Sequence, residues 1–165
     1  MRNVHNLFLL VFILGAIFTG NVNAQTNGNN TKSTQTSTKG NAGKVINLTK
    51  AEFLKQIYNY EKNPQKWTYE GNKPCIIDFY ATWCGPCKKV SPILDELAKT
   101  YKDQIVIYKI DVDKEKKLAT DFGIQSIPSL LFVPKNGTPR MSQGALSKEE
   151  FINQIETFLL EKKKP

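Results

Sequence analysis

Histidine and cysteine are scarce in this chain of 165 residues, which contains one histidine and three cysteines. The histidine, His5, lies near the N-terminus, so the rest of the chain has no histidine for acid–base catalysis or for a histidine-rich metal site. Structural zinc takes about four ligands, and the sequence has neither a second C-x-x-C motif nor a histidine pair. We therefore expect no metal site and no bound cofactor.

The apolar run Leu7–Phe18 is well short of the roughly 20 residues that cross a bilayer. It follows the positive charge of Arg2 and precedes Val22 and Ala24, which stand at the two positions that a signal peptidase reads. This pattern predicts a signal peptide over residues 1–24, cleaved after Ala24. The protein is then periplasmic or secreted, with no stable membrane insertion; an uncleaved anchor is the alternative that the short run disfavours.

Apolar residues are almost absent from residues 25–43, which are rich in Asn, Thr, Ser, Gly and Lys. Such a composition cannot bury a core and predicts a flexible polar linker before a domain over residues 44–165. The chain has 23 Lys and Arg against 15 Asp and Glu, a formal net charge of +8. Because the lysines are scattered and no aromatic-basic repeat accompanies them, we expect no nucleic-acid partner.

The domain alternates strands with helices and then turns into a hairpin. Apolar runs predict strands over 45–46, 66–69, 76–81, 105–110 and 130–133 and around Arg140. Capping boxes at Thr49/Glu52 and Ser147/Glu150 open the first and last helices, Asp113 can cap another, and Gly123 closes it. We expect the first helix to end at Asn63-Pro64 and Asn136-Gly137 to form the hairpin turn. This order predicts an α/β fold with a central mixed sheet and helices on both faces.

The segment Trp83-Cys84-Gly85-Pro86-Cys87 lies where a buried strand turns into a helix. We expect Cys84 to be exposed at the helix N-terminus, where unpaired amide hydrogens and the helix dipole stabilise a thiolate and lower the pKa of its thiol. Cys87 is one helical turn away, close enough to form a disulfide. Cys84 can therefore attack a substrate disulfide and Cys87 can resolve the mixed disulfide. A permanent staple is the alternative, but so short a loop constrains little of the unfolded chain.

Two further residues of the same strand bear on this chemistry. Asp78 stands inside an apolar run, and burial of an acid raises its pKa; the alternative is a side chain turned to solvent at the strand edge. Cys75 begins the strand, which favours a packed, inert thiol over a regulatory one.

The stretch from Asp78 to Lys88, D-F-Y-A-T-W-C-G-P-C-K, resembles the active-site segment of the thioredoxin family. The resemblance continues over residues 92–98, 109–113, 122–129, 136–137 and 144–147, and spans about residues 45–160. It implies a thioredoxin fold. Two departures are visible: Tyr80 stands where tryptophan is common, and the segment 58–74 is longer than usual, which fits either a padded edge or a partner-docking surface.

The resemblance also implies roles for individual residues. Asp78 accepts the proton of Cys87 through a water molecule, and Lys109 either tunes that acid or is an ordinary exposed strand lysine. Ile127-Pro128 matches a cis pair facing the cysteines, so that the Ile127 backbone is free to pair with an extended substrate. The substrate-binding residues that the resemblance implies are Trp83, Gly85, Pro86, Ile127, Pro128 and Gly144.

The function that we predict is reduction of protein disulfides through the Cys84/Cys87 dithiol. The Gly-Pro dipeptide between the cysteines is that of reducing thioredoxins. Exported proteins with disulfides are the expected substrates of a monomeric enzyme, and a membrane-embedded thiol donor supplies its electrons. Three alternatives remain open: a disulfide oxidase or isomerase, a reductase serving cytochrome c maturation, and a non-catalytic binding module on the same fold.

Overall fold

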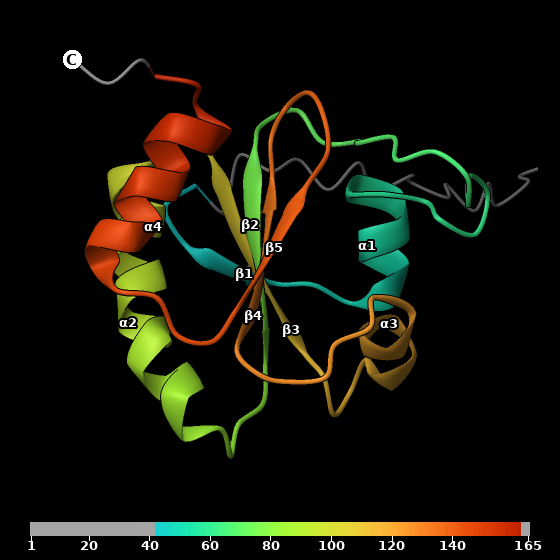
Figure 1. Ribbon diagram of the computed structural model, residues 1–165, viewed down its shortest axis with the longest axis horizontal. Helices are drawn as coiled ribbons and strands as arrows, with labels where there is room; N and C mark the ends of the chain where they lie inside the picture. Colours follow the sequence, from blue (N-terminus) through green and yellow to red (C-terminus); the bar gives the residue numbers. More distant parts are fainter. Residues whose placement is uncertain (1–41, 163–165) are drawn as a thin grey trace, which may run out of the picture. The chain divides into compact units, whose positions relative to one another are not determined.

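The computed structural model describes residues 42–162, and these form a five-stranded sheet flanked by helices (Figure 1). The predicted signal peptide and nearly all of the predicted linker lie outside the described residues. The strands are β1 (Val45–Asn47), β2 (Cys75–Tyr80), β3 (Val106–Asp111), β4 (Ser129–Val133) and β5 (Arg140–Gln143), in the spatial order β1-β3-β2-β4-β5. Both β1 and β2 pair with β3 in parallel, whereas β4 runs antiparallel to β2 and β5 antiparallel to β4. The predicted mixed sheet is confirmed.

Helices cover both faces of the sheet. Figure 1 shows α2 (Gly85–Thr100) and α4 (Lys148–Gln154) on one face and α1 (Lys50–Gln56) and α3 (Lys116–Asp121) on the other; the π-helical segment η2 (Ile155–Leu159) continues α4. Because side chains alternate along a strand, β2 supplies Ile76 to the core under α2 and α4 and Ile77 and Phe79 to the core under α1 and α3. Within residues 42–162, no helix is long and apolar enough to cross a membrane.

Both predicted capping boxes are present. The backbone N–H of Glu52 donates to Thr49 Oγ1 at 3.3 Å, and the Thr49 N–H donates back to Glu52 Oε2 at 2.9 Å. Ser147 and Glu150 make the same reciprocal pair at 3.2 and 2.7 Å. Each cap satisfies amide hydrogens that a helix start leaves unpaired, and removing such a cap typically costs about 1 kcal/mol.

The prediction that the first helix runs to Asn63-Pro64 is wrong, because α1 ends at Gln56. The N–H groups of Ile57 and Tyr58 both donate to the carbonyl of Phe53, at 2.9 and 3.1 Å, so the helical register is lost there. Asn59 then accepts the Lys62 N–H on its side chain at 3.1 Å and starts a separate turn. A local side-chain hydrogen bond of this kind competes with helix continuation.

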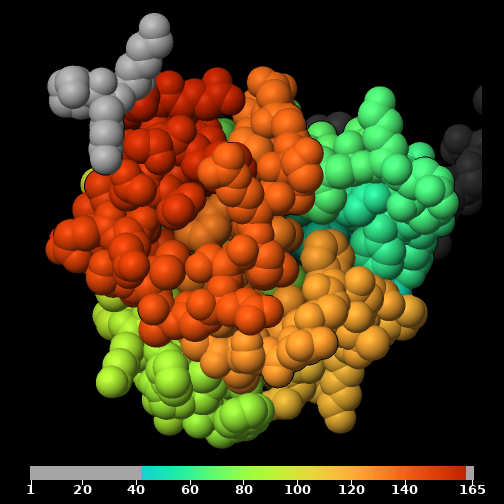
Figure 2. All heavy atoms as spheres, viewed as in Figure 1, coloured from blue at the N-terminus to red at the C-terminus, as the bar shows by residue number. Residues whose placement is uncertain are grey.

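The predicted strand over residues 66–69 is also wrong, since this part of the segment 58–74 has no ladder of backbone hydrogen bonds. Its Trp67 ring instead packs against Tyr58, with 4.4 Å between ring centroids, and the Glu70 N–H returns to the Ile57 carbonyl at 2.9 Å. Trp67 and Tyr69 both contact the core under α1 and α3. The space-filling view shows the segment as green surface at the upper right, beside α1 (Figure 2).

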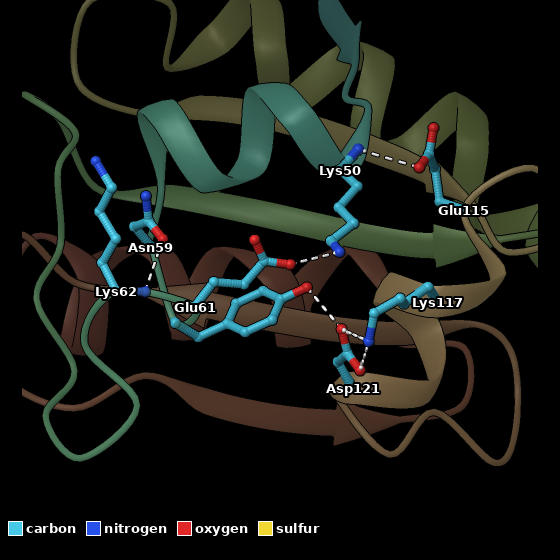
Figure 3. A network of polar contacts seen from close by, with 8 residues as sticks. Lys50, Asn59, Glu61, Lys62, Glu115, Lys117 and Asp121 are labelled. Atoms are coloured by element: carbon cyan, nitrogen blue, oxygen red, sulfur yellow. Dashed lines mark hydrogen bonds and ion pairs between the residues drawn. The ribbon is translucent and has the colours of Figure 1, made fainter.

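A polar network fastens the segment 58–74 to α1 and α3 (Figure 3). Lys50 at the start of α1 pairs with Glu61 at 2.6 Å. The Tyr60 hydroxyl donates to Asp121 of α3 at 2.8 Å, and Asp121 in turn pairs with Lys117 at 2.9 Å. Exposed pairs of this kind contribute on the order of 0–1 kcal/mol each, so the network fixes where the segment lies more than it stabilises the fold.

Candidate active site

The cysteine pair lies where β2 gives way to α2. Cys84 is the N-cap residue of α2 and Pro86 stands in its first turn, where a missing amide hydrogen costs nothing. Cys84 and Cys87 form a disulfide with 5.3 Å between their Cα atoms. The Cys87 N–H donates to Cys84 Sγ at 3.1 Å, so the helix start points an amide donor at this sulfur. With no acidic residue in the first turn of α2, this position favours a thiolate.

The expectation that Cys84 is exposed is wrong, because only 3% of its surface is accessible. Cys84 and Cys87 pack with Ala81, and the side chains of Tyr80, Val112 and Ile127 close around this cysteine cluster. Gly85 and Pro86 between the two cysteines remain exposed. In the disulfide form, Cys84 is therefore largely covered by these neighbours.

The loop before β4 faces Cys84. The Ile127-Pro128 peptide bond is cis, as predicted, and the Ile127 carbonyl oxygen lies 3.7 Å from Cys84 Sγ. Within residues 42–162, neither the N–H nor the carbonyl of Ile127 takes part in a backbone–backbone hydrogen bond. Gly144 lies beside this pair, since its N–H donates to the Pro128 carbonyl at 2.8 Å, and its φ of 89° suits glycine. An extended peptide can thus pair with Ile127 next to the reactive sulfur.

Trp83 presents an apolar surface at the same place, with 67% of the residue exposed. Its indole Nε1–H donates to Asp113 Oδ2 at 2.8 Å, which holds the ring. Asp113 does not cap α3 as predicted: the N-cap residue is Glu115, without a side-chain cap hydrogen bond, whereas Gly123 ends the helix region with a φ of 62°. Asp113 is therefore a site residue that its sequence pattern did not indicate, because an acid before a helix also fits a cap.

Asp78 is buried in β2, with 3% of its surface exposed, so the alternative of a solvent-facing side chain is excluded. Burial raises the pKa of this carboxyl group to about 7, and the charge of Lys109 opposes that rise. Its Oδ1 atom has no hydrogen-bond partner among the described residues. A carboxyl group with such a pKa can take up and release a proton at neutral pH.

Lys109 of β3 stands directly opposite Asp78 in the strand register and is half-buried. None of the ion pairs within residues 42–162 joins the two side chains. The Lys109 ammonium instead lies over the Tyr80 ring, 5.5 Å from its centroid. Lys109 therefore acts on Asp78 through its charge alone, which favours the tuning interpretation over that of an ordinary exposed lysine.

Cys75, at the opposite end of β2, is packed as predicted. It is a free cysteine with 0% of its surface exposed, and burial raises the pKa of its thiol to about 12. A thiol with this pKa carries almost no thiolate near neutral pH and is a poor nucleophile.

The described residues contain no cluster of three or more His, Cys, Asp or Glu side chains that could hold a metal ion. The chemistry that the described site supports is thus that of the two cysteines, with the titratable carboxyl group of Asp78 in the strand that leads to them. This arrangement can exchange a dithiol for a disulfide.

Comparisons with known proteins agree with this chemistry. The model of the Thioredoxin family matches residues 44–157. The chain is 45% identical over 114 residues to a thioredoxin of Borreliella burgdorferi, which covers 69% of this chain and 97% of that protein. It is 33% identical over 115 residues to a bifunctional thioredoxin reductase/thioredoxin of Mycobacterium leprae, covering 70% of this chain and 23% of that protein. A solved chloroplastic thioredoxin z superposes with a TM-score of 0.57 at 27% identity, over 69% of this chain and 96% of that one.

Proposed function

The chain belongs to the thioredoxin family, and we propose that it works outside the cytosol, where it reduces disulfides of exported proteins with electrons from a membrane-embedded thiol donor. Its activity is that of a protein-disulfide reductase, a thiol–disulfide oxidoreductase with Cys84 and Cys87 as its redox pair. Protein disulfides are its substrates, and a reductase partner must return electrons to the pair.

The observation that carries the catalytic part is Cys84 at the start of α2, facing the free backbone of Ile127. In the cycle, the Cys84 thiolate attacks a substrate disulfide, forms a mixed disulfide and releases the first substrate thiolate. We propose that Asp78 then takes the proton of the Cys87 thiol. The Cys87 thiolate attacks Cys84 Sγ, the Cys84–substrate bond breaks, and the second substrate thiolate leaves and takes up a proton. Two electrons pass from the dithiol to the substrate, and the Cys84–Cys87 disulfide remains.

The substrate surface in this proposal comprises Trp83, Gly85, Pro86, Ile127, Pro128 and Gly144. Trp83 supplies an exposed ring, and Ile127 supplies free backbone groups. An extended peptide seated on Ile127 brings its disulfide against Cys84 without needing a particular side chain. The enzyme therefore acts on unrelated disulfide proteins.

The residues before the domain support the proposal of export. The apolar run Leu7–Phe18 and the small residues up to Ala24 fit a cleaved signal peptide, and the polar residues 25–43 fit a spacer. Outside the cytosol thiols are driven toward disulfides, so a reductase there needs electrons delivered across the membrane. The Mycobacterium leprae relative combines thioredoxin with thioredoxin reductase, which supports a dedicated electron source for a domain of this family.

Three measurements test this function. Mass spectrometry of the protein recovered from its native cell should find a mature N-terminus at Gln25; an intact Met1 on a cytosolic protein would overturn the export proposal. Equilibration with glutathione should give a reducing potential for the Cys84–Cys87 pair, whereas an oxidising potential would favour an oxidase or isomerase. The Cys87→Ser variant should trap mixed disulfides with exported proteins, and these identify the substrates.

A further inference from the structure

Four ionisable side chains share one face of the sheet next to the cysteine cluster. Asp78 and Tyr80 alternate with the inward-facing Phe79 on β2, and the register places Lys109 opposite Asp78 and Asp111 opposite Tyr80 on β3. Because partners across a ladder project to the same face, all four side chains project toward the side that α2 covers. Next to the proposed proton acceptor, this face of the sheet thus carries the Lys109 cation and the Tyr80 ring.

Tyr80 contacts both the cysteines and the cation. It packs against the cluster of Ala81, Cys84 and Cys87, and the Lys109 ammonium lies 5.5 Å from the centroid of its ring. This distance is within the range of a cation–π interaction. A lysine ammonium is strongly hydrated and its stem is flexible, so a half-buried lysine without an ion-pair partner tends to turn its charge out to water. Something must hold Lys109 in place, and the ring is the group over which its charge lies.

We propose that Tyr80 is a positioning residue of the reductase site, which uses the face of its ring to hold the Lys109 charge beside Asp78. The proposal rests on the proposed role of Asp78 as the proton acceptor for Cys87. Tyr80 touches neither the proton nor the substrate in this step. It acts through Lys109, whose positive charge favours the ionised form of Asp78 and thereby keeps a base available near neutral pH.

Few charged groups besides Lys109 surround Asp78. The residue opposite Asp78 on β4 is the apolar Leu130. The first two buried residues of α2 are Cys87 and Val90, and neither carries a charge while the disulfide is formed. On β2 and β3 the charged or titratable neighbours on its face are Tyr80, Lys109 and Asp111. Asp111 is itself engaged, since it pairs with Lys114 at 3.7 Å and accepts the Asp113 N–H at 3.0 Å. Among the described residues, Lys109 is thus the cation whose charge opposes the effect of burial on the pKa of Asp78.

The test is an NMR titration of the Asp78 carboxyl carbon in the oxidised full-length protein, in which the disulfide removes both site thiols from the titration. In Tyr80→Leu, the side chain remains apolar but offers no ring, so Lys109 turns to solvent and the midpoint for Asp78 rises by about half a pH unit. That shift is about a threefold drop in the ratio of ionised to protonated Asp78 at a given pH. Tyr80→Phe and Tyr80→Trp keep an aromatic face and should leave the midpoint unchanged.

A double variant shows whether Tyr80 acts on Asp78 through Lys109 or only by shielding Asp78 from water. If Tyr80 acts through Lys109, then Lys109→Met alone raises the Asp78 midpoint at least as much as Tyr80→Leu, and adding Tyr80→Leu to Lys109→Met causes no further shift. An unchanged midpoint in Tyr80→Leu, or the same shift in the Lys109→Met background, overturns the proposal. Lys109 is half-buried on a strand, so the Lys109→Met arm remains informative even where Tyr80→Leu folds poorly.

A further experiment distinguishes an error in the proposal for Tyr80 from an error in the proposed role of Asp78 as proton acceptor. The pH profile of disulfide reduction by Asp78→Asn reports on Asp78 directly. A profile identical to that of the wild type overturns the role of Asp78 as proton acceptor, and with it the catalytic consequence of Tyr80. An altered profile in Asp78→Asn together with an unshifted titration in Tyr80→Leu overturns the role of Tyr80 alone.

Discussion

The two ends of β2 place the same functional group in opposite surroundings. At its start, Cys75 is fully buried in the core under α1 and α3, and the pKa of its thiol is raised to about 12. Beyond its end, Cys84 is nearly as buried but receives the Cys87 N–H at 3.1 Å and lies 3.7 Å from the Ile127 carbonyl. Burial alone therefore does not separate the reactive cysteine from the inert one. The difference lies in the backbone donors and the substrate approach that surround Cys84.

The parts of the chain that pack over the two ends of β2 also differ. The segment 58–74 lies over the start of β2, where Trp67 and Tyr69 pack against the core that contains Cys75. The Tyr69 hydroxyl donates to the Lys73 carbonyl at 2.5 Å. At the other end the cover is a helix N-terminus and the loop carrying Ile127. The fold thus seals one end of the strand and opens the other to a peptide.

The largest expected effect separates the two ends by activity. Cys84→Ser should reduce insulin, with dithiothreitol as the electron source, no faster than the uncatalysed reaction, because the attacking sulfur is gone. Cys75→Ala should keep the wild-type rate while losing about 1 kcal/mol of stability to a small cavity. Residual catalysis in Cys84→Ser, or its loss in a folded Cys75→Ala, would reverse the assignment of the two ends.

The next effect concerns stability and pH. The pKa of Asp78 is raised from 3.8 to about 7, so the folded state binds a proton that the unfolded chain has released at pH values between these two. This contribution to stability is present below about pH 4 and is lost as the pH rises through 7. Asp78→Asn should therefore be more stable than the wild type by up to about 4 kcal/mol at pH 8, and show no such gain near pH 3.

Urea unfolding of both oxidised proteins across this pH range measures the effect. A gain that stays constant with pH would show that the Asp78 carboxyl group does not titrate as described.

A smaller effect is expected from a substitution in the segment 58–74, which covers Cys75 at the start of β2. A Cβ atom at Gly71 would lie 2.2 Å from the Tyr69 hydroxyl oxygen, closer than atoms can approach. Gly71→Ala should displace the Tyr69 ring, destabilise the fold by about 1–3 kcal/mol and speed the labelling of Cys75 by a thiol reagent. Gly85→Ala is the matched control for stability, since a Cβ atom there meets nothing within 4 Å. Equal stability of the two variants would show that the segment does not seal this end of β2.

The smallest expected effect concerns Trp83, beside the cysteine pair. Asp113→Ala removes the acceptor of the Trp83 indole hydrogen bond, which at this exposed position contributes about 1 kcal/mol to the orientation of the ring. We expect about a fivefold rise in KM for insulin with little change in kcat, because Trp83 serves binding and not the thiol chemistry. A fall in kcat at unchanged KM would argue that Asp113 acts on the cysteines.

The sequence predicted the fold correctly mostly where the evidence came from residues close together in the chain. Capping boxes, the apolar runs of β1 to β4 and the strand–turn–helix at Cys84 all concern neighbouring residues, and the structure has each of them, whereas the run 66–69 forms no strand. The burial of Asp78 was readable as well, because the residues on both sides of it are apolar.

Other errors arose where residues distant in the chain meet. The chain beside the predicted strand 66–69 is held by the Glu70 N–H, which donates to the Ile57 carbonyl, and the carboxylate of Asp113 binds an indole 30 residues away in the chain. Neither contact leaves a local pattern. The contact of Lys109 with Tyr80 also joins two strands, so no spacing in the sequence indicates it.

The start of α2 makes Cys84 the reactive cysteine, although Cys84 is nearly as buried as Cys75. Alkylation of the fully reduced protein with iodoacetamide at pH 7, followed over time by mass spectrometry of its peptides, tests this claim directly. We predict that Cys84 is labelled first and that Cys75 stays unlabelled until denaturant unfolds the protein. Labelling of Cys75 in the folded protein at a rate comparable with that of Cys84 would contradict the claim.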